Sequence, residues 1–186
     1  MVVCMNQQFD ERKSPSEIAR LRDNSFSANY DKHDVGTAMV RDKLGEHGLT
    51  VFEHGDDRRD EDVYSGTGVD QGVQYDGDVC GYIETKTKTS ADWMGRCNLR
   101  DWCEYRGFAT YENAPVYVYF ALVEDVDSAH ITEQFFVRVP SMGEGDIAEE
   151  LPFQSKGHSL VEISDEHAVG WPRVLSAFFG TVDTLD

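Results

Sequence analysis

The stretch that most constrains the fold runs from Gly68 to Thr89 and reads GVDQGVQYDGDVCGYIETKTKT. At its centre stands Asp76-Gly77, a pair that suits a two-residue turn in which both central residues take positive φ. Alternating and β-branched residues on either side favour two strands, over residues 69–75 and 79–88. The segment therefore predicts an antiparallel hairpin that belongs to a larger sheet.

Helical and strand-like segments alternate around this hairpin. Helices are expected from Asp34 to Leu44, ended by Gly45 or Gly48, and from Ser90 to Gly107. Further strands are expected over residues 49–53, 115–122, 134–139 and 160–163, with a last helix over 171–179. The alternation predicts an α/β sandwich. The length of 186 residues fits a single domain over 1–186, with 1–30 as a loosely ordered or helical N-terminal extension.

Acidic residues outnumber basic ones by two to one. The chain holds 35 Asp and Glu against 17 Lys and Arg, which gives a formal net charge of −18. Such a protein suits a basic partner, whereas in molar salt a Debye length of about 3 Å screens the repulsion among carboxylates. The acids are spread along the whole chain and form no tail, which favours adaptation to salt. We therefore expect a haloarchaeal or halophage source, and net charge is then no argument against DNA binding.

Several classes of protein are disfavoured by what the sequence lacks. Its four cysteines form no CxxC pair, its six histidines form no HxH or HExxH motif, and no GxxxxGK loop is present. The cysteines therefore fit small core residues or free thiols, and a histidine-based metal site is not expected. No apolar run approaches the roughly 20 residues of a membrane-spanning helix, and no signal peptide is visible. We expect a cytoplasmic protein with no membrane partner.

Charged side chains converge when the hairpin is paired about its turn. Position 70 then lies opposite residues 83 and 84, so the carboxylates of Asp70 and Glu84 meet. Lys86 and Lys88 project to the same side as Glu84, because side chains alternate along a strand. Two close carboxylates repel unless a cation joins them, and hard oxygen ligands suit Mg²⁺ or Mn²⁺. Such an ion activates water and orients a phosphate, and a nearby lysine stabilises the charge that develops on phosphorus.

On these residues the chain resembles the PD-(D/E)XK nuclease superfamily, which includes restriction endonucleases, archaeal Holliday-junction resolvases and phage exonucleases. Val69-Asp70 stands where that family has Pro-Asp, and Glu84-Thr85-Lys86 stands for (D/E)XK. The order of elements over about residues 34–140 is also similar: helix, strand, catalytic hairpin, helix and hydrophobic strand. The resemblance implies a restriction-endonuclease-like α/β/α sandwich with a central mixed sheet. It also implies that Asp70 and Glu84 bind the metal with the Thr85 carbonyl, and that Lys86 is the catalytic lysine.

The identity of two acidic ligands is not settled by the family pattern. Many members carry a glutamate on the first core helix, but residues 36–40 offer none, so this ligand is missing or comes from Asp34, Asp42 or Glu46. Asp78 competes with Asp70 for the role of first carboxylate. It lies beside the turn and only six residues before Glu84, which favours Asp70.

The expected helix over residues 90–107 is the second place to look for substrate contacts. Arg96 and Arg100 are spaced for one helix face, with Asn98 nearby, and related nucleases often use such a residue to hold a phosphate. The alternative is a surface helix on which Arg100 pairs with Glu104. Candidate nucleic-acid contacts are therefore Lys88, Arg96, Asn98 and Arg100. The tryptophans of this stretch, at positions 93 and 102, are expected in the core.

The resemblance implies a metal-dependent DNA endonuclease that acts in recombination or repair, similar to a Holliday-junction resolvase. Resolvases act as dimers, so a homodimer is compatible with it. A second hypothesis is a catalytically inactive relative that serves as a nucleic-acid-binding or structural subunit. A third is an unrelated acidic α/β adaptor for a basic protein, which would be supported if Asp70 and Glu84 proved far apart in the folded chain, with no cleft between them.

Overall fold

The computed structural model describes residues 31–54, 69–151 and 159–182. The expected N-terminal extension over 1–30 and the charged loop before the hairpin lie outside these ranges. A six-stranded sheet with the order β1-β2-β3-β5-β6-β9 forms the centre of the molecule. Its strands are β1 (Thr50–Glu53), β2 (Gln71–Tyr75), β3 (Asp78–Lys88), β5 (Val116–Asp125), β6 (His130–Arg138) and β9 (Ala168–Val169). A smaller sheet holds β4 (Arg96–Asn98), β8 (Leu160–Ile163) and β7 (Ala148–Glu150), in that order.

The central sheet is mixed. The pairs β1–β2, β2–β3, β5–β6 and β6–β9 are antiparallel, whereas β3 and β5 run parallel. The hairpin turn is the expected one, since Asp76 and Gly77 have φ values of 51° and 94°. The parallel pair requires a crossover between β3 and β5, and α2 (Leu99–Glu112) supplies it.

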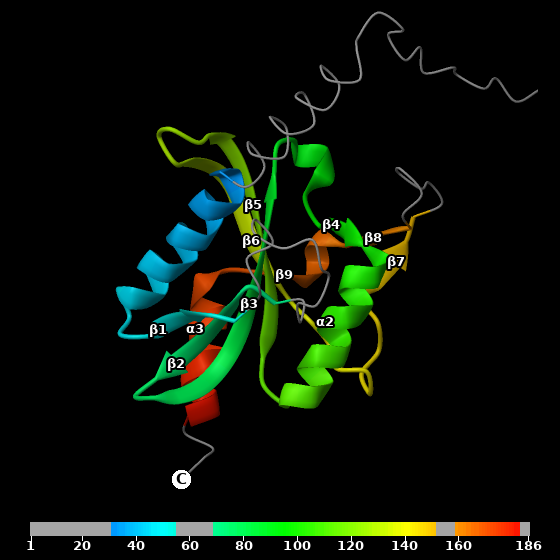
Figure 1. Cartoon of the computed structure of the whole chain (residues 1–186). Coiled ribbons are helices and arrows are strands. Elements are labelled where there is room, and N and C mark those ends of the chain that lie inside the picture. The colour runs from blue at the N-terminus through cyan, green and yellow to red at the C-terminus, as the bar shows by residue number, and fades with distance from the viewer. Residues whose placement is uncertain (1–30, 55–68, 152–158, 183–186) are drawn as a thin grey trace, which may run out of the picture.

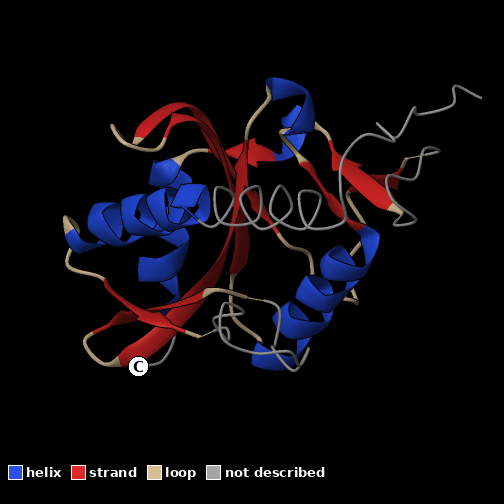
Figure 2. Cartoon of the chain, turned by 45° about the horizontal axis from the view of Figure 1, so that its top comes forward, coloured by secondary structure: helices blue, strands red, loops and turns tan. Residues whose placement is uncertain are grey.

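Helices cover both faces of the sheet (Figures 1 and 2). The helix over residues 31–45 and α3 (Trp171–Val182) lie on one face, while α2 and the smaller sheet lie on the other. Each face has its own core: Leu44, Ile83 and Phe178 belong to the first, Trp102 and Val118 to the second. The predicted α/β/α sandwich with a central mixed sheet is confirmed, and so is the predicted order of elements through β5.

The stretch after β3 differs from the expected helix. Instead of one helix over 90–107, the chain forms a 3-10 turn η1 (Ala91–Trp93), strand β4 and then α2. Gly95 has a φ of 74°, and its carbonyl accepts a hydrogen bond from Ile163 N at 3.0 Å. This break lets Cys97 pair with Val161 of β8 and become buried. Arg96 and Arg100 therefore do not share a helix face, and Trp93 is 41% exposed rather than in the core.

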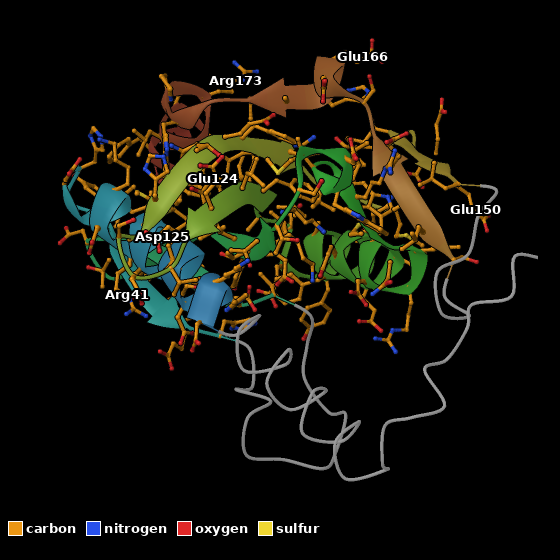
Figure 3. All side chains as sticks on the ribbon, turned by 90° about the horizontal axis from the view of Figure 1, so that it is seen from above. Arg41, Glu124, Asp125, Glu150, Glu166 and Arg173 are labelled. Atoms are coloured by element: carbon orange, nitrogen blue, oxygen red, sulfur yellow. The ribbon has the colours of Figure 1, made fainter. Side chains whose placement is uncertain are left out.

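The first helix also begins earlier than expected. Residues 31–45 are helical, so Asp34 lies inside the helix and is not its N-terminal cap. The extra turn matters, because it carries His33 toward the hairpin. Figure 3 shows charged side chains at the periphery of the molecule, among them Arg41 on this helix, Glu150 on β7 and Glu166 on the short turn η2 (Asp165–His167).

Candidate active site

The backbone of the hairpin brings Asp70 and Glu84 together. Gln71, the first residue of β2, pairs with Ile83 of β3, so Asp70 falls beside the next residue of β3. The amide of Asp70 donates to Oε2 of Glu84 at 3.1 Å, and the amide of Thr85 donates to Oδ2 of Asp70 at 2.8 Å. The convergence predicted from the turn is thus present, although the register shifts between Val73 and Gln74. The separation of these carboxylates that would have supported an unrelated adaptor is therefore not observed.

Glu84 is nearly inaccessible to solvent, and its second oxygen is held by two donors. Its Oε1 lies 2.7 Å from Nζ of Lys86 and accepts a hydrogen bond of 2.8 Å from the hydroxyl of Tyr105. Tyr105 comes from α2 and is itself 2% exposed. The Lys86 ammonium also lies 5.4 Å from the centre of the Tyr105 ring. Residues from β3 and α2 therefore form one buried charged network.

A histidine from the first helix completes the other side of the site. Nε2 of His33 lies 3.0 Å from Oδ2 of Asp70. Burial opposes the charged imidazole, yet the hydrogen bond with Asp70 and the charges of Asp70 and Glu84 raise the pKa of His33 above its usual value. The hydroxyl of Thr37 donates to the carbonyl of His33 at 2.9 Å, one turn along the same helix. Two layers of the sandwich thus contribute to one site.

The two carboxyl groups titrate differently because their surroundings differ. Burial and the charge of Asp70 raise the pKa of Glu84 to about 7, against the opposing effects of Lys86 and Tyr105. Burial also acts on Asp70, but His33, the amide of Thr85 and Lys86 outweigh it, so the pKa of Asp70 is lowered. Burial opposes the charge of Lys86 as well, and the carboxylate of Glu84 raises the pKa of its ammonium despite this. Such opposite shifts within one buried cluster are typical of functional sites.

The four expected nucleic-acid contacts lie around this network, and each has a partner within the protein. Nζ of Lys88 donates to the carbonyl of Arg96 at 2.6 Å, and Arg96 forms a 2.7 Å ion pair with Glu162. Asn98, directly before α2, donates to Asp101 at 3.2 Å. Arg100 contacts Asp101 at 3.2 Å and Glu104 at 3.5 Å, so the pairing with Glu104 that belonged to the alternative of a surface helix is present.

The other acidic residues considered as metal ligands are exposed in the structure. Asp78 begins β3 opposite Tyr75, at the turn end of the hairpin, and is exposed. Asp34, Asp42 and Glu46 are exposed positions, and Glu46 pairs with Lys43 at 2.6 Å. The side chain that the first helix brings to Asp70 is His33, which the sequence alone did not single out. Asp101 and Tyr105 were also missed, although their spacing of four residues on a helix could have indicated a shared face.

Asp70 and Glu84 offer the oxygen ligands that a hard divalent cation prefers, but the described side chains are not arranged as a complete metal site. Asp70 and Glu84 place two carboxylates side by side. Burial and, after it, the charge of Asp70 raise the pKa of Glu84, and a cation would relieve the second of these. Yet in the part of the chain that the structure describes, no three His, Cys, Asp or Glu side chains form a group that could hold a metal ion. At Glu84, Oε1 is engaged by Lys86 and Tyr105.

No protein-family model and no curated protein matches the chain. Among solved structures, the chain is similar to the Holliday junction resolvase Hjc of Archaeoglobus fulgidus, an archaeal hyperthermophile. The sequences are 15% identical, the TM-score is 0.42, and the match covers 75% of this chain and 93% of that one. At that TM-score the likeness is distant, so the function proposed below rests on the residues of the site. No helix within the described ranges is long and apolar enough to cross a membrane.

Proposed function

We propose that this chain is a divalent-metal-dependent nuclease that hydrolyses phosphodiester bonds of DNA, with Asp70, Glu84 and Lys86 at its centre. The observation that carries the proposal is the buried contact of Lys86 with Glu84, beside Asp70. Burying a lysine between carboxylates costs desolvation energy that a hydrophobic replacement would avoid. A cluster of this kind is retained more readily for chemistry than for stability.

The residues of the site take distinct roles in this proposal. Asp70 and Glu84, together with the carbonyl of Thr85, would hold Mg²⁺ or Mn²⁺, which when bound supplies an activated water and neutralises phosphate charge. His33 orients Asp70 through its 3.0 Å contact. The ammonium of Lys86 faces the charge that develops on phosphorus during hydrolysis and stabilises it. Tyr105 fixes the rotamer of Glu84 from the opposite layer.

DNA is the proposed substrate, with branched DNA and a role in recombination or repair as the narrower form. Lys88, Arg96, Asn98 and Arg100 surround the network and are the candidates for phosphate contacts. DNA must compete with the internal partners of the three cations in this set, Lys88, Arg96 and Arg100. Contacts between cations and phosphates weaken with salt, so affinity is expected to fall as salt rises. A homodimer would let two such sites act on the two strands of a junction.

The proposal is tested by cleavage of labelled duplex, single-stranded and four-way-junction DNA in high KCl, with Mg²⁺ or Mn²⁺. Lys86→Ala is expected to lower the rate by at least about 100-fold, because a donor aimed at the developing charge is lost. The matched control is Lys43→Ala, which removes a lysine from the outside of the first helix, where it pairs with Glu46. EDTA is expected to stop cleavage. Equal activity of wild type and Lys86→Ala would overturn the proposal.

A second candidate is a non-catalytic relative that binds nucleic acid. The observation in its favour is that both oxygens of Glu84 accept hydrogen bonds from within the protein. Folded protein that binds DNA in a gel-shift assay, but cuts none of the three substrates with either metal, would establish this candidate in place of the first.

A further inference from the structure

Helix α2 presents two polar side chains to the network, one turn apart. Tyr105 reaches Glu84, and Asp101 reaches Lys86, with 3.7 Å between Oδ2 of Asp101 and Nζ of Lys86. A spacing of four residues puts both on one helix face. The ammonium of Lys86 therefore lies between two carboxylates, the nearer on its own strand and the farther on α2.

Asp101 is held in place independently of Lys86. Its Oδ2 accepts from Nδ2 of Asn98 at 3.2 Å, and its Oδ1 lies 3.2 Å from the guanidinium of Arg100. Its side chain is 16% exposed. Burial opposes its charge, but Lys86, Asn98 and Arg100 together lower the pKa of Asp101 below its usual value. Asp101 is thus a fixed negative charge at the edge of the site.

The present contact of the Lys86 ammonium with Glu84 opposes the binding of a metal ion to that carboxylate. Oε1 of Glu84 is engaged by both Lys86 and Tyr105. A divalent cation on the same carboxylate would repel the ammonium at close range, in a site of low effective dielectric. Lys86 must then leave Glu84, and the other carboxylate that contacts it in the described structure is Asp101.

We propose that Asp101 is the positioning residue that receives the ammonium of Lys86 when Glu84 binds the metal. The transfer removes the ammonium from Oε1 of Glu84, which keeps its hydrogen bond from Tyr105, and it keeps Lys86 aimed into the site, where a phosphate would lie. Asp101 is then neither a metal ligand nor a group that touches substrate. This inference rests on the proposed nuclease function, because it assigns a residue to the same site.

The test measures Mn²⁺ affinity by calorimetry without DNA, alongside single-turnover cleavage. Asp101→Asn keeps the shape of the side chain but removes its charge, so Lys86 stays on Glu84 and competes with the metal. We expect Mn²⁺ binding to weaken by about 10-fold, as is typical for coupled sites. We also expect kcat to fall with KM little changed. The matched control is Glu104→Gln, which removes an exposed carboxylate from the same helix that also contacts Arg100, and both readouts should stay within about two-fold of wild type.

A double-mutant cycle with Lys86→Met separates positioning from a general charge effect. Without Lys86 there is no competitor, so Asp101→Asn should no longer change the Mn²⁺ affinity. An equal loss of affinity in both backgrounds would overturn the inference, as would unchanged Mn²⁺ binding in Asp101→Asn. Coupling in the Mn²⁺ titration without cleavage of any DNA would support Asp101 and refute the nuclease. Wild-type protein that does not bind Mn²⁺ would overturn both.

Discussion

The face of the central sheet toward α3 buries side chains without formal charge, whereas the face toward α2 buries a carboxylate and a lysine among its apolar residues. On the first face, the rings of Tyr117, Phe136 and Phe178 meet edge to face at centroid distances of 5.7 and 6.4 Å. On the second, Glu84 and Lys86 pair with Val118 and Phe120 of β5, which belong to one core cluster with Trp102 and Tyr105. Both β3 and β5 contribute to the two faces, because their alternate residues point to opposite layers.

The aromatic residues on the α3 face stabilise the fold, whereas the charged residues on the α2 face are proposed to serve catalysis. An aromatic cluster gains free energy from burial and from edge-to-face contacts. A buried ion pair roughly breaks even against a hydrophobic pair of the same volume. Substitutions on the α3 face should therefore change stability while activity per folded molecule is kept, and substitutions in the charged network should do the reverse.

The largest stability effect is expected from Phe178→Ala. Phe178 is fully buried, and it packs so closely on Gly81 that a Cβ at that glycine would lie 2.3 Å from its ring. Removing the ring should lower the free energy of unfolding by about 4 kcal/mol, measured by urea denaturation at constant KCl. Its neighbour Phe179 is only half-buried, so Phe179→Ala should cost about 1 to 2 kcal/mol. Equal costs for the two, or a loss of cleavage per folded molecule in Phe178→Ala, would break the distinction between the faces.

The next effect concerns metal binding and stability on the α2 face. Mn²⁺ at 100 times its dissociation constant should raise the free energy of unfolding by about 3 kcal/mol, and EDTA should reverse the gain. Asp70→Asn should abolish it, because one of the two proposed carboxylate ligands is lost. Asp78→Asn is the matched control, since this exposed carboxylate lies at the turn end of the same hairpin. Thermal unfolding with and without Mn²⁺ measures the effect, and loss of the gain in Asp78→Asn instead would reassign the first carboxylate.

Local signals were enough to predict the hairpin and the convergence of Asp70 and Glu84, but not the strands β4, β7 and β9. Asp76-Gly77 fixes the hairpin by its need for positive φ, and strand alternation then places Glu84 and Lys86 on one side. The apolar run after Pro115 correctly indicated a central strand, β5. These features depend on residues that are near one another in the sequence.

The features that were missed depend on tertiary pairing. Cys97 lies in a strand because it pairs with Val161, which is far away in the chain. The local sequence around Cys97 does not predict this pairing. His33 reaches Asp70 across 37 positions, so its role as the first-helix side chain at the site required the packed helix. The contact between Asp101 and Lys86 could be read only once α2 was known to begin at Leu99.

The smallest expected effect is a pH-dependent change in stability at Lys88, which lies at the edge of the charged network. Its ammonium donates to the carbonyl of Arg96 at 2.6 Å and lies 5.7 Å from the centre of the Phe120 ring. Burial, with the charge of Lys86 adding to it, lowers the pKa of Lys88 from 10.5 to about 8. Between pH 8 and 10.5 the unfolded chain therefore binds more protons at this residue than the folded chain. The contribution of Lys88 to stability thus rises with pH across that window.

Lys88→Met keeps an unbranched side chain over Phe120 and removes the titrating group. At pH 7.5 the variant should be more stable than wild type by about 1 to 2 kcal/mol, after allowance for partial solvent access. The gap should narrow as the pH rises to 9.5, because wild-type Lys88 loses its proton. Lys88→Arg stays charged at both pH values, so it should show no such recovery. Urea denaturation of the three proteins at pH 7.5 and 9.5 measures this, and a constant gap between wild type and Lys88→Met would mean that Lys88 is hydrated and outside the buried charged face.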